Sequence, residues 1–297
     1  MLSPELIRRI KRIHIRSGRM VDTMMAGQYR SVFRGSGIEF EEVREYSPGD
    51  EVKSIDWKVT ARMGRPYVKL FREERELLLM LLVDVSGSGG FGTTEALKRD
   101  TAAEVAAVLA FNAIRNNDKI GAVLFTDAVE RYVPPKKGAS HVWRLVKELL
   151  SHSPERRGTD IGLATDFLAK VSRKRTVTFI ISDFMDRDYI ASLKRVARKH
   201  DVIAVFVSDP GDDRLPEAGI LEAEDLESGR RYLLDCSDPA TREAYAARRQ
   251  AWRARTVEDL GRAGIDTIHL STDASVADAL RAFFRRRERR ELRGRRG

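Results

Sequence analysis

Short apolar runs alternate along most of the chain with longer stretches in which apolar residues recur at helical spacing. The first run, at 77–83, holds seven consecutive apolar residues, which is typical of a strand buried on both faces of a sheet. Runs of the same kind follow at 120–125, 176–182, 201–208 and 266–271. The stretches between them, such as 94–116 and 141–150, show the helical pattern. This alternation predicts a mostly parallel, doubly wound α/β sheet that is covered by helices on both faces.

Two segments depart from the alternation. The segment VERYV at 129–133, followed by Pro134 and Pro135, predicts a short antiparallel edge strand that ends at the prolines. The segment 220–235 has two β-rich arms around Ser228-Gly229, which indicates a hairpin inserted after the fifth strand.

The two ends of the chain differ from its centre in residue pattern and charge. Residues 1–76 predict a basic amphipathic helix that starts at Ser3 and, after a glycine-rich break at 35–37, a small β-rich extension. A main domain is expected over 77–284. Residues 285–297 form an arginine-rich tail that carries most of the formal net charge of +9. This tail is either a solvated helix end or a segment that contacts phosphates.

Composition limits the classes of protein that need to be considered. A hydrophobic fraction of 42% and a charged fraction of 33% over 297 residues are typical of a globular protein. No apolar run approaches the roughly 20 residues of a membrane-spanning helix, and the start of the chain lacks the pattern of a secretory signal. The single cysteine, Cys236, fits a reducing compartment. We therefore expect a cytoplasmic protein without a membrane span. We expect no specific nucleic-acid partner, because no aromatic residue follows Phe284 among the tail arginines.

The residues that carry chemistry lie where two buried strands end. Asp84 directly follows the first strand, and Asp183 directly follows the strand at 176–182. In a doubly wound sheet, ligands bind beyond the carboxyl ends of strands at the point where neighbouring crossovers leave on opposite faces. Two carboxylates about 6 Å apart there would repel by roughly 3 kcal/mol at an effective dielectric near 20. Either one carboxylate is protonated or a cation lies between them.

Three hydroxyl groups accompany the two carboxylates. Ser86 and Ser88 flank a glycine in the loop after Asp84, and Thr159 lies in a Gly-Thr-Asp loop before a helix. Each aspartate alone is explained by loop or helix capping. Five hard oxygen donors without a matching His or Cys predict instead a site for Mg²⁺ or Mn²⁺ rather than zinc.

These motifs resemble a known site. The D-x-S-x-S sequence at 84–88, the G-T-D-I-G loop at 158–162 and the strand-terminal Asp183 resemble the metal-ion-dependent adhesion site of von Willebrand factor type A domains. The resemblance implies a Rossmann-like sheet of the von Willebrand A type. It also implies that the three hydroxyls ligate the metal directly and that Asp84 and Asp183 hold it through water. Gly89 departs from the family, which often has methionine at this position.

The segment 37–74 resembles the signature of the bacterial family called domain of unknown function 58, and the two resemblances together cover roughly residues 30–210. The family resemblance implies a MoxR-type AAA+ ATPase as partner. It makes the following residues candidates for partner binding, although a purely structural role for the segment is equally open: Arg44, Tyr46, Asp50, Asp56, Trp57 and Arg62.

Three functional classes remain compatible with these residues. The first is a non-catalytic, divalent-metal-dependent protein-interaction module, an adaptor or co-chaperone whose partner offers an Asp or Glu carboxylate to the metal. The second is a magnesium phosphohydrolase of the haloacid-dehalogenase type, but Ser86 stands where those enzymes have their general acid/base. The third is a nucleotide-binding protein, but Asp84 before the glycine-rich loop would repel a pyrophosphate. We therefore expect an interaction module that is not an enzyme.

Overall fold

The computed structural model of the chain describes residues 38–73 and 77–294. These residues fall into two compact units, the smaller within 38–73 and the larger from Leu78 onward. The predicted helix that starts at Ser3 and the glycine-rich break at 35–37 lie outside the described residues.

The smaller unit is built on one antiparallel strand pair. Strands β1 (Ile38–Glu45) and β2 (Tyr67–Glu73) pair along their length, so the β-rich extension is confirmed. The connection between them holds a short 3₁₀ turn, η1 (Val52–Ser54), and a helix that the sequence pattern did not predict, α3 (Trp57–Met63). Asp56 caps this helix by accepting the N–H groups of Lys58 and Val59, which satisfies two of the free donors in its first turn.

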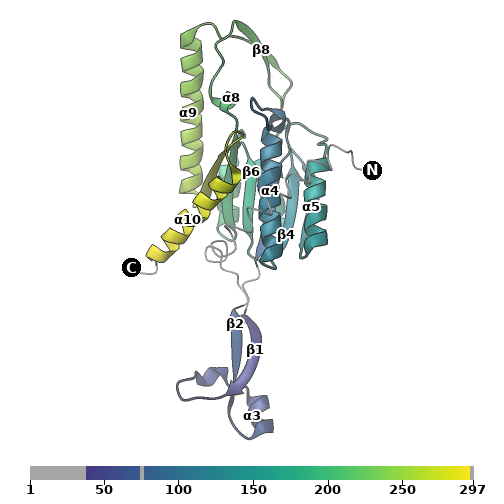
Figure 1. The fold of residues 1–297 in the computed structure, drawn as a ribbon, viewed down its shortest axis with the longest axis vertical. Coiled ribbons are helices and arrows are strands. Elements are labelled where there is room, and N and C mark those ends of the chain that lie inside the picture. The colour runs from purple at the N-terminus through teal and green to yellow at the C-terminus, as the bar shows by residue number, and fades with distance from the viewer. Residues whose placement is uncertain (1–37, 74–76, 295–297) are drawn as a thin grey trace. The chain divides into compact units, whose positions relative to one another are not determined.

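The larger unit is organised around a six-stranded sheet with the strand order β10-β7-β6-β3-β4-β5 (Figure 1). All neighbouring strands pair in parallel except β5, which is the antiparallel edge strand, so the predicted α/β fold class is confirmed. The strands of this sheet are β3 (Leu78–Asp84), β4 (Lys119–Phe125), β5 (Val129–Lys136), β6 (Val177–Ser182), β7 (Asp201–Ser208) and β10 (Asp266–Ser271).

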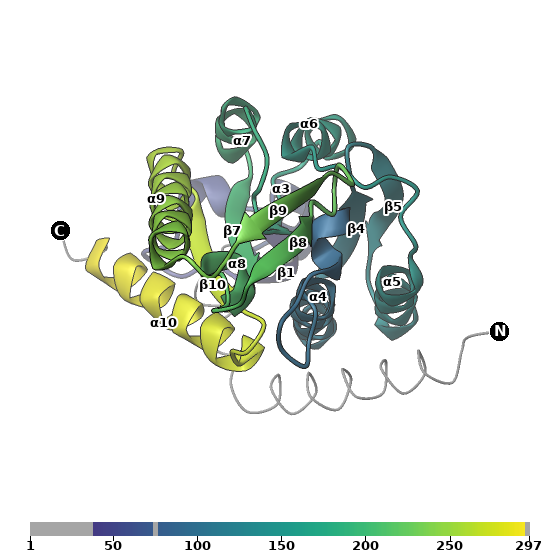
Figure 2. The same ribbon diagram turned by 90° about the horizontal axis from the view of Figure 1, so that it is seen from above.

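Helices cover both faces of the sheet (Figure 2). One layer contains α4 (Lys98–Arg115), α5 (Ala139–Ser151) and α10 (Val276–Gly294). The opposite layer contains α6 (Ile161–Val171), α7 (Ile190–Ala197) and α9 (Pro239–Arg262). The central strands are buried on both faces because of these layers, and the interior residues of β3 and all residues of β6 are buried.

Three element boundaries differ from those predicted. Strand β5 continues through Pro134 and Pro135 to Lys136, because an edge strand tolerates residues that lack an N–H donor. Helix α10 continues past Phe284 to Gly294, which makes the start of the arginine-rich tail helical. This extension is anchored on the sheet, where Arg287 pairs with Asp201 at 2.5 Å.

Helix α4 begins at Lys98 rather than near Thr94. In the segment before the helix, Thr93 donates both its backbone N–H and its hydroxyl to Asp209, which follows β7. This shift makes Lys98 the first residue of the helix, at the carboxyl edge of the sheet.

The predicted hairpin insertion is present as β8 (Ile220–Glu224) and β9 (Arg231–Asp235), which pair antiparallel. Asp225 shapes the connecting turn by accepting the backbone N–H groups of Glu227 and Ser228 and the Ser228 hydroxyl. Gly229 completes the turn with a φ of 69°, in the left-handed region that favours glycine. The arms of the hairpin are largely exposed, with Ile220 at 72% and Leu233 at 76%.

No helix within the described ranges is long and apolar enough to cross a membrane.

The predicted site residues lie at the carboxyl edge of the sheet. The chain leaves β3 toward α4 on one face and leaves β6 toward α7 on the other, so the crossovers diverge between these two strands. A short 3₁₀ turn, η2 (Gly87–Gly90), and the one-turn helix α8 (Pro210–Asp213) also lie at this edge.

Candidate functional site

Strands β3 and β6 are direct neighbours, as a shared site for their terminal residues requires. Their register pairs Val83 with Ile181, so Asp84 and Ser182 lie at the same level of the sheet and Asp183 follows one residue later. The Ser182 hydroxyl donates a hydrogen bond of 2.6 Å to Asp84 Oδ2. The ends of the two strands are therefore joined by a polar contact directly at the divergence of the crossovers.

Both predicted aspartates also stabilise their own loops. Asp84 Oδ1 accepts the backbone N–H of Ser86 at 2.9 Å, and Asp183 Oδ1 accepts the backbone N–H of Met185 at 3.2 Å. The capping interpretation is thus correct for one oxygen of each carboxylate. The second oxygen of each one faces the other polar groups of the site.

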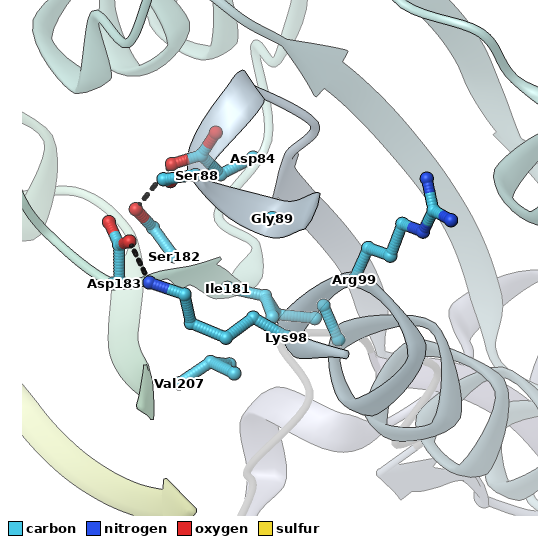
Figure 3. Close-up of a pocket in the computed structure, with 10 residues that line it drawn as sticks. Asp84, Ser88, Gly89, Lys98, Arg99, Ile181, Ser182, Asp183 and Val207 are labelled. Atoms are coloured by element: carbon cyan, nitrogen blue, oxygen red, sulfur yellow. Dashed lines mark hydrogen bonds and ion pairs between the residues drawn. The ribbon is translucent and has the colours of Figure 1, made fainter. Parts of the chain in front are cut away.

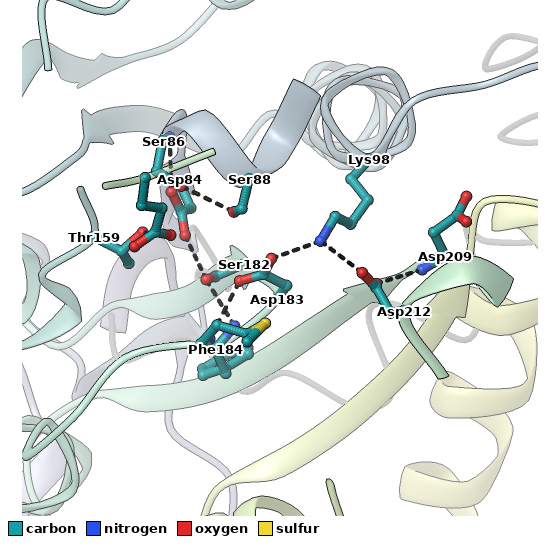
Figure 4. Close-up of polar contacts among 12 residues, drawn as sticks. Asp84, Ser86, Ser88, Lys98, Thr159, Ser182, Asp183, Phe184, Asp209 and Asp212 are labelled. Atoms are coloured by element: carbon teal, nitrogen blue, oxygen red, sulfur yellow. Dashed lines mark hydrogen bonds and ion pairs between the residues drawn. The ribbon is translucent and has the colours of Figure 1, made fainter. Parts of the chain in front are cut away.

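The three predicted hydroxyls come from two loops that are tied together. Ser86 and Ser88 have their Oγ atoms 3.2 Å apart, and the N–H of Gly87 between them donates to the carbonyl of Arg157 at 2.9 Å. Thr159 lies two residues after that carbonyl. Figure 4 shows the side chains of Ser86, Ser88 and Thr159 at the same edge of the sheet as Asp84 and Asp183, so the structure places the five predicted donors at one edge.

A small cavity lies among several of these groups (Figure 3). It has a volume of about 20 Å³, enough for one water-sized occupant. Its polar lining residues are Asp84, Ser88, Ser182 and Asp183, together with the basic residues Lys98 and Arg99. A cavity of this size fits a single ion or a water molecule.

Lys98 is a site residue that the sequence patterns did not reveal. Its Nζ lies 2.8 Å from Asp183 Oδ2 and 3.3 Å from Asp212 Oδ1, and the three side chains are at most 10% exposed. Burial tends to lower the pKa of Lys98, but the two carboxylates outweigh burial and hold it above its usual value. The sheet edge therefore contains a buried, charged ammonium group beside one predicted metal carboxylate.

Glu227, at the tip of the β8–β9 hairpin, is the second residue that was not predicted. Its Oε1 accepts a hydrogen bond of 2.8 Å from the Thr159 hydroxyl. Burial, together with repulsion from Asp183 and Asp84, raises the pKa of Glu227 to about 7. A third carboxylate is thus electrostatically coupled to the two predicted ones.

The charges of the site are unbalanced. Desolvation and, after it, repulsion from Asp183 raise the pKa of Asp84 to about 6. Four carboxylates, those of Asp84, Asp183, Asp212 and Glu227, lie at this edge, and Lys98 pairs with two of them. Arg99 also lines the cavity, and Arg249 donates to the backbone carbonyl of Asp212. A divalent cation would relieve this surplus of negative charge, and the surrounding donors are the hard oxygens that Mg²⁺ and Mn²⁺ prefer.

The donor set is not a cluster of charged ligands. Among the residues that the structure describes, no group of three or more His, Cys, Asp and Glu side chains is placed to hold a metal ion. Any metal at this edge of the sheet therefore depends on the neutral hydroxyls of Ser86, Ser88 and Thr159. The chemistry of the residues fits Mg²⁺ or Mn²⁺, and it does not fit a soft metal such as zinc held by sulfur or imidazole.

The residues that were not predicted differ in how visible they are in the sequence. Ser182 immediately precedes Asp183 at the end of a predicted strand, and its position alone marks it as a neighbour of the site. Lys98 would have been noticed if the helix had been predicted to start there. Glu227 is 68 residues from Thr159 and lies in an insertion, so no local pattern identifies it.

The candidate partner-binding residues lie in the smaller unit and divide into two groups. Arg44 and Asp50 form a bidentate ion pair with contacts of 2.8 and 2.6 Å, and Asp56 caps α3, so these three have structural partners. Tyr46 is half-buried and donates its backbone N–H to Pro66. Trp57, which is 66% exposed, and the exposed Arg62 are available on the surface of this unit.

The fold and the site together define an α/β domain with an oxygen-rich pocket at the switch point of a doubly wound sheet. The chain belongs to the family described as "Protein of unknown function DUF58", whose family model matches residues 42–255. This match confirms the family resemblance based on the sequence motifs.

Known proteins similar to this chain include uncharacterised proteins of Mycobacterium bovis and Mycobacterium tuberculosis. They are 32% identical to it over 290 residues, which is 96% of this chain and 90% of theirs. Among solved structures, an aerotolerance-related membrane protein from Bacteroides fragilis has a TM-score of 0.48 at 17% identity, over 72% of this chain and 99% of that one. The SpRpn10 VWA domain has a TM-score of 0.40 at 10% identity, over 69% and 94%.

Proposed function

We propose that this protein is a divalent-metal-dependent protein-interaction module. In this proposal Ser86, Ser88 and Thr159 ligate Mg²⁺ or Mn²⁺ directly, and Asp84 and Asp183 hold it through water. The metal supplies a positive charge with an open coordination position, which the carboxylate of a partner protein can fill. The observation that carries the proposal is that the five oxygen donors lie at one edge of the sheet, where Asp84, Ser88 and Asp183 line a cavity that fits one ion.

The neutral character of the hydroxyl ligands supports binding rather than catalysis. Three hydroxyls leave more of the cation's charge uncompensated than three carboxylates would, so an incoming acid is attracted. The structure also offers a surface for such an acid. A cavity of about 500 Å³ borders Asp84 and Ser86, has an apolar part formed by Leu149 and Leu150, and carries basic groups on its rim. The basic residues that line it are Arg99, Arg156 and Arg157. We propose that it receives an acidic segment of the partner.

A phosphohydrolase is the alternative function, and Lys98 beside Asp183 is the observation that favours it, because buried lysines can neutralise phosphate oxygens. Two contacts argue against it. Both oxygens of Asp84, the would-be nucleophile, accept hydrogen bonds from Ser86 and Ser182. The Lys98 ammonium group already forms ion pairs with Asp183 and Asp212, so it is not free to bind a phosphate oxygen. We therefore propose that the protein is not an enzyme and hydrolyses neither phosphate esters nor ATP.

A MoxR-type AAA+ ATPase in the cytoplasm is our proposed partner, with the chain acting as its adaptor or co-chaperone. Membership of the family is what supports this identification. Within the smaller unit, Trp57 and Arg62 are the proposed contact residues because both are exposed. Arg44, Asp50 and Asp56 are proposed to stabilise the fold of this unit through their ion pair and helix cap.

The test is metal binding followed by partner capture. We expect the wild-type protein to bind Mn²⁺, measured as loss of the free-ion signal in electron paramagnetic resonance, and the double variant S86A/S88A to lose this binding. The matched control is S151A/S192A, which removes two helix-surface hydroxyls that take no part in the site. Capture of an AAA+ ATPase from a lysate should require Mg²⁺ and be abolished by EDTA. Equal Mn²⁺ binding by both double variants would refute the site.

A further inference from the structure

The tip of the β8–β9 hairpin contacts the candidate metal site, although the arms of the hairpin are exposed. Ile220 and Leu233 on the arms are 72% and 76% exposed, whereas Leu226 and Glu227 at the tip are partly buried. The hairpin is an insertion between β7 and α9 and is not part of the central sheet. Its tip is therefore the part of the insertion that the rest of the larger unit covers.

The contact involves the backbone of the metal-binding loop itself. A Cβ atom added to Gly87, which lies between the two serine ligands, would be only 2.1 Å from the carbonyl oxygen of Leu226. Such a distance is a severe clash with backbone atoms, so the close approach of the hairpin requires glycine at this position. The tip thus rests directly on the loop that carries Ser86 and Ser88.

The residue after Leu226 presents a carboxylate to the same site. Glu227 accepts the hydroxyl of Thr159, the third hydroxyl ligand, at 2.8 Å and interacts electrostatically with Asp84 and Asp183. Asp84 and Asp183 repel the Glu227 carboxylate, and a cation bound at the hydroxyl groups would weaken this repulsion. The side-chain bonds of Asp225 to the N–H groups of Glu227 and Ser228 fix the turn that orients Glu227.

We propose that Glu227 is the chain's own carboxylate ligand for the site and occupies the coordination position that a partner's acid must take. This proposal rests on the metal site of the proposed function and adds its regulation. With the hairpin docked, the module is closed; a partner binds after its carboxylate displaces Glu227. The exposed arms allow the tip to leave without disturbing the central sheet. If the closed form holds about nine-tenths of the molecules, the affinity for an external carboxylate is lowered about tenfold.

The experiment compares Glu227→Gln with Glu222→Gln, a matched control on an exposed arm of the same hairpin. The probes are Mn²⁺ alone, followed by magnetic resonance, and glutarate added to the Mn²⁺-loaded protein, followed by calorimetry. We expect E227Q to bind Mn²⁺ more weakly than the wild type and to bind glutarate about tenfold more tightly. E222Q should match the wild type in both. Hydrogen exchange at 221–235 should slow on addition of Mn²⁺ in the wild type and stay unchanged in E227Q.

A second variant, Asp225→Ala, keeps Glu227 but loosens the turn that presents it. Glutarate affinity should rise in this variant also, because the tip is less often docked. If the wild type, E227Q and D225A bind Mn²⁺ and glutarate equally well, Glu227 is not a ligand, while the metal site stands. If none of the three binds Mn²⁺, the proposed function itself fails.

Discussion

Lys98 provides a sharp test of the electrostatics of the site, because it is the cation that the structure places beside Asp183. At an effective dielectric near 20, its attraction is about 6 kcal/mol to Asp183 at 2.8 Å and about 5 kcal/mol to Asp212 at 3.3 Å. The desolvation of three nearly buried charges offsets much of this attraction. Removal of one partner from a buried ion pair typically costs about 3–5 kcal/mol. We expect Lys98→Met to lower the free energy of unfolding by that amount at pH 7.5 in EDTA.

Magnesium should rescue this variant more than it stabilises the wild type. A ligand that binds only the folded state at 100 times its dissociation constant adds about 2.7 kcal/mol. Lys98→Met should gain more than the wild type at the same Mg²⁺ concentration, because without the ammonium group the cation meets a more negative site.

The assay is urea unfolding monitored by circular dichroism, with and without Mg²⁺. Lys170→Met, at an exposed position near the end of α6, is the control and should change the free energy of unfolding by less than about 0.5 kcal/mol. A loss below about 1 kcal/mol for Lys98→Met in EDTA would contradict the assigned ion pairs. Equal stabilisation of the variant and the wild type by Mg²⁺ would show that Lys98 and the metal do not share a carboxylate.

Three further predictions address other parts of the molecule. Burial, together with nearby positive charges, lowers the pKa of His200 to about 4, so the neutral ring is favoured in the folded state and stability is lost as pH falls from about 6.5 toward 4. His200→Gln should remove up to roughly 3 kcal/mol of this pH dependence in urea unfolding, and an unchanged pH profile would refute the assignment. Gly87→Ala should displace the hairpin tip from the site and speed hydrogen exchange at 225–230; unaltered exchange would contradict the close contact. Asp56→Ala removes the cap of α3 and should destabilise the smaller unit by about 1 kcal/mol, detectable as faster exchange at 57–63, and Asp56→Asn should retain most of the protection.

The sheet and part of the site could be predicted because their determinants are local. The apolar run before Asp84 and the one before Asp183 each identify a buried strand, and the rule that ligands bind beyond strand ends then places both residues at one edge. Ser86 and Ser88 are fixed relative to Asp84 by only a few bonds of the chain. Such features depend on periodicity and short spacing, both of which are readable from one sequence.

The features that were missed depend on contacts between distant segments. The segment before α4 is held by hydrogen bonds from Thr93 to Asp209, which is 116 residues away. Glu227 reaches Thr159 only because the inserted hairpin folds back over the loop at Gly87. A contact of this kind is decided by the direction in which an insertion leaves the fold, and apolar periodicity carries no information about that direction.

The prolines of the edge strand have a consequence for how partners can approach. Pro134 and Pro135 offer no N–H group, so the outer side of β5 cannot serve as a continuous template for a strand from another chain. Recruitment by β-augmentation along this border is thereby disfavoured, and so is self-association through it. A protein that recognises this border of the sheet must therefore do so through side-chain contacts rather than by continuous main-chain pairing.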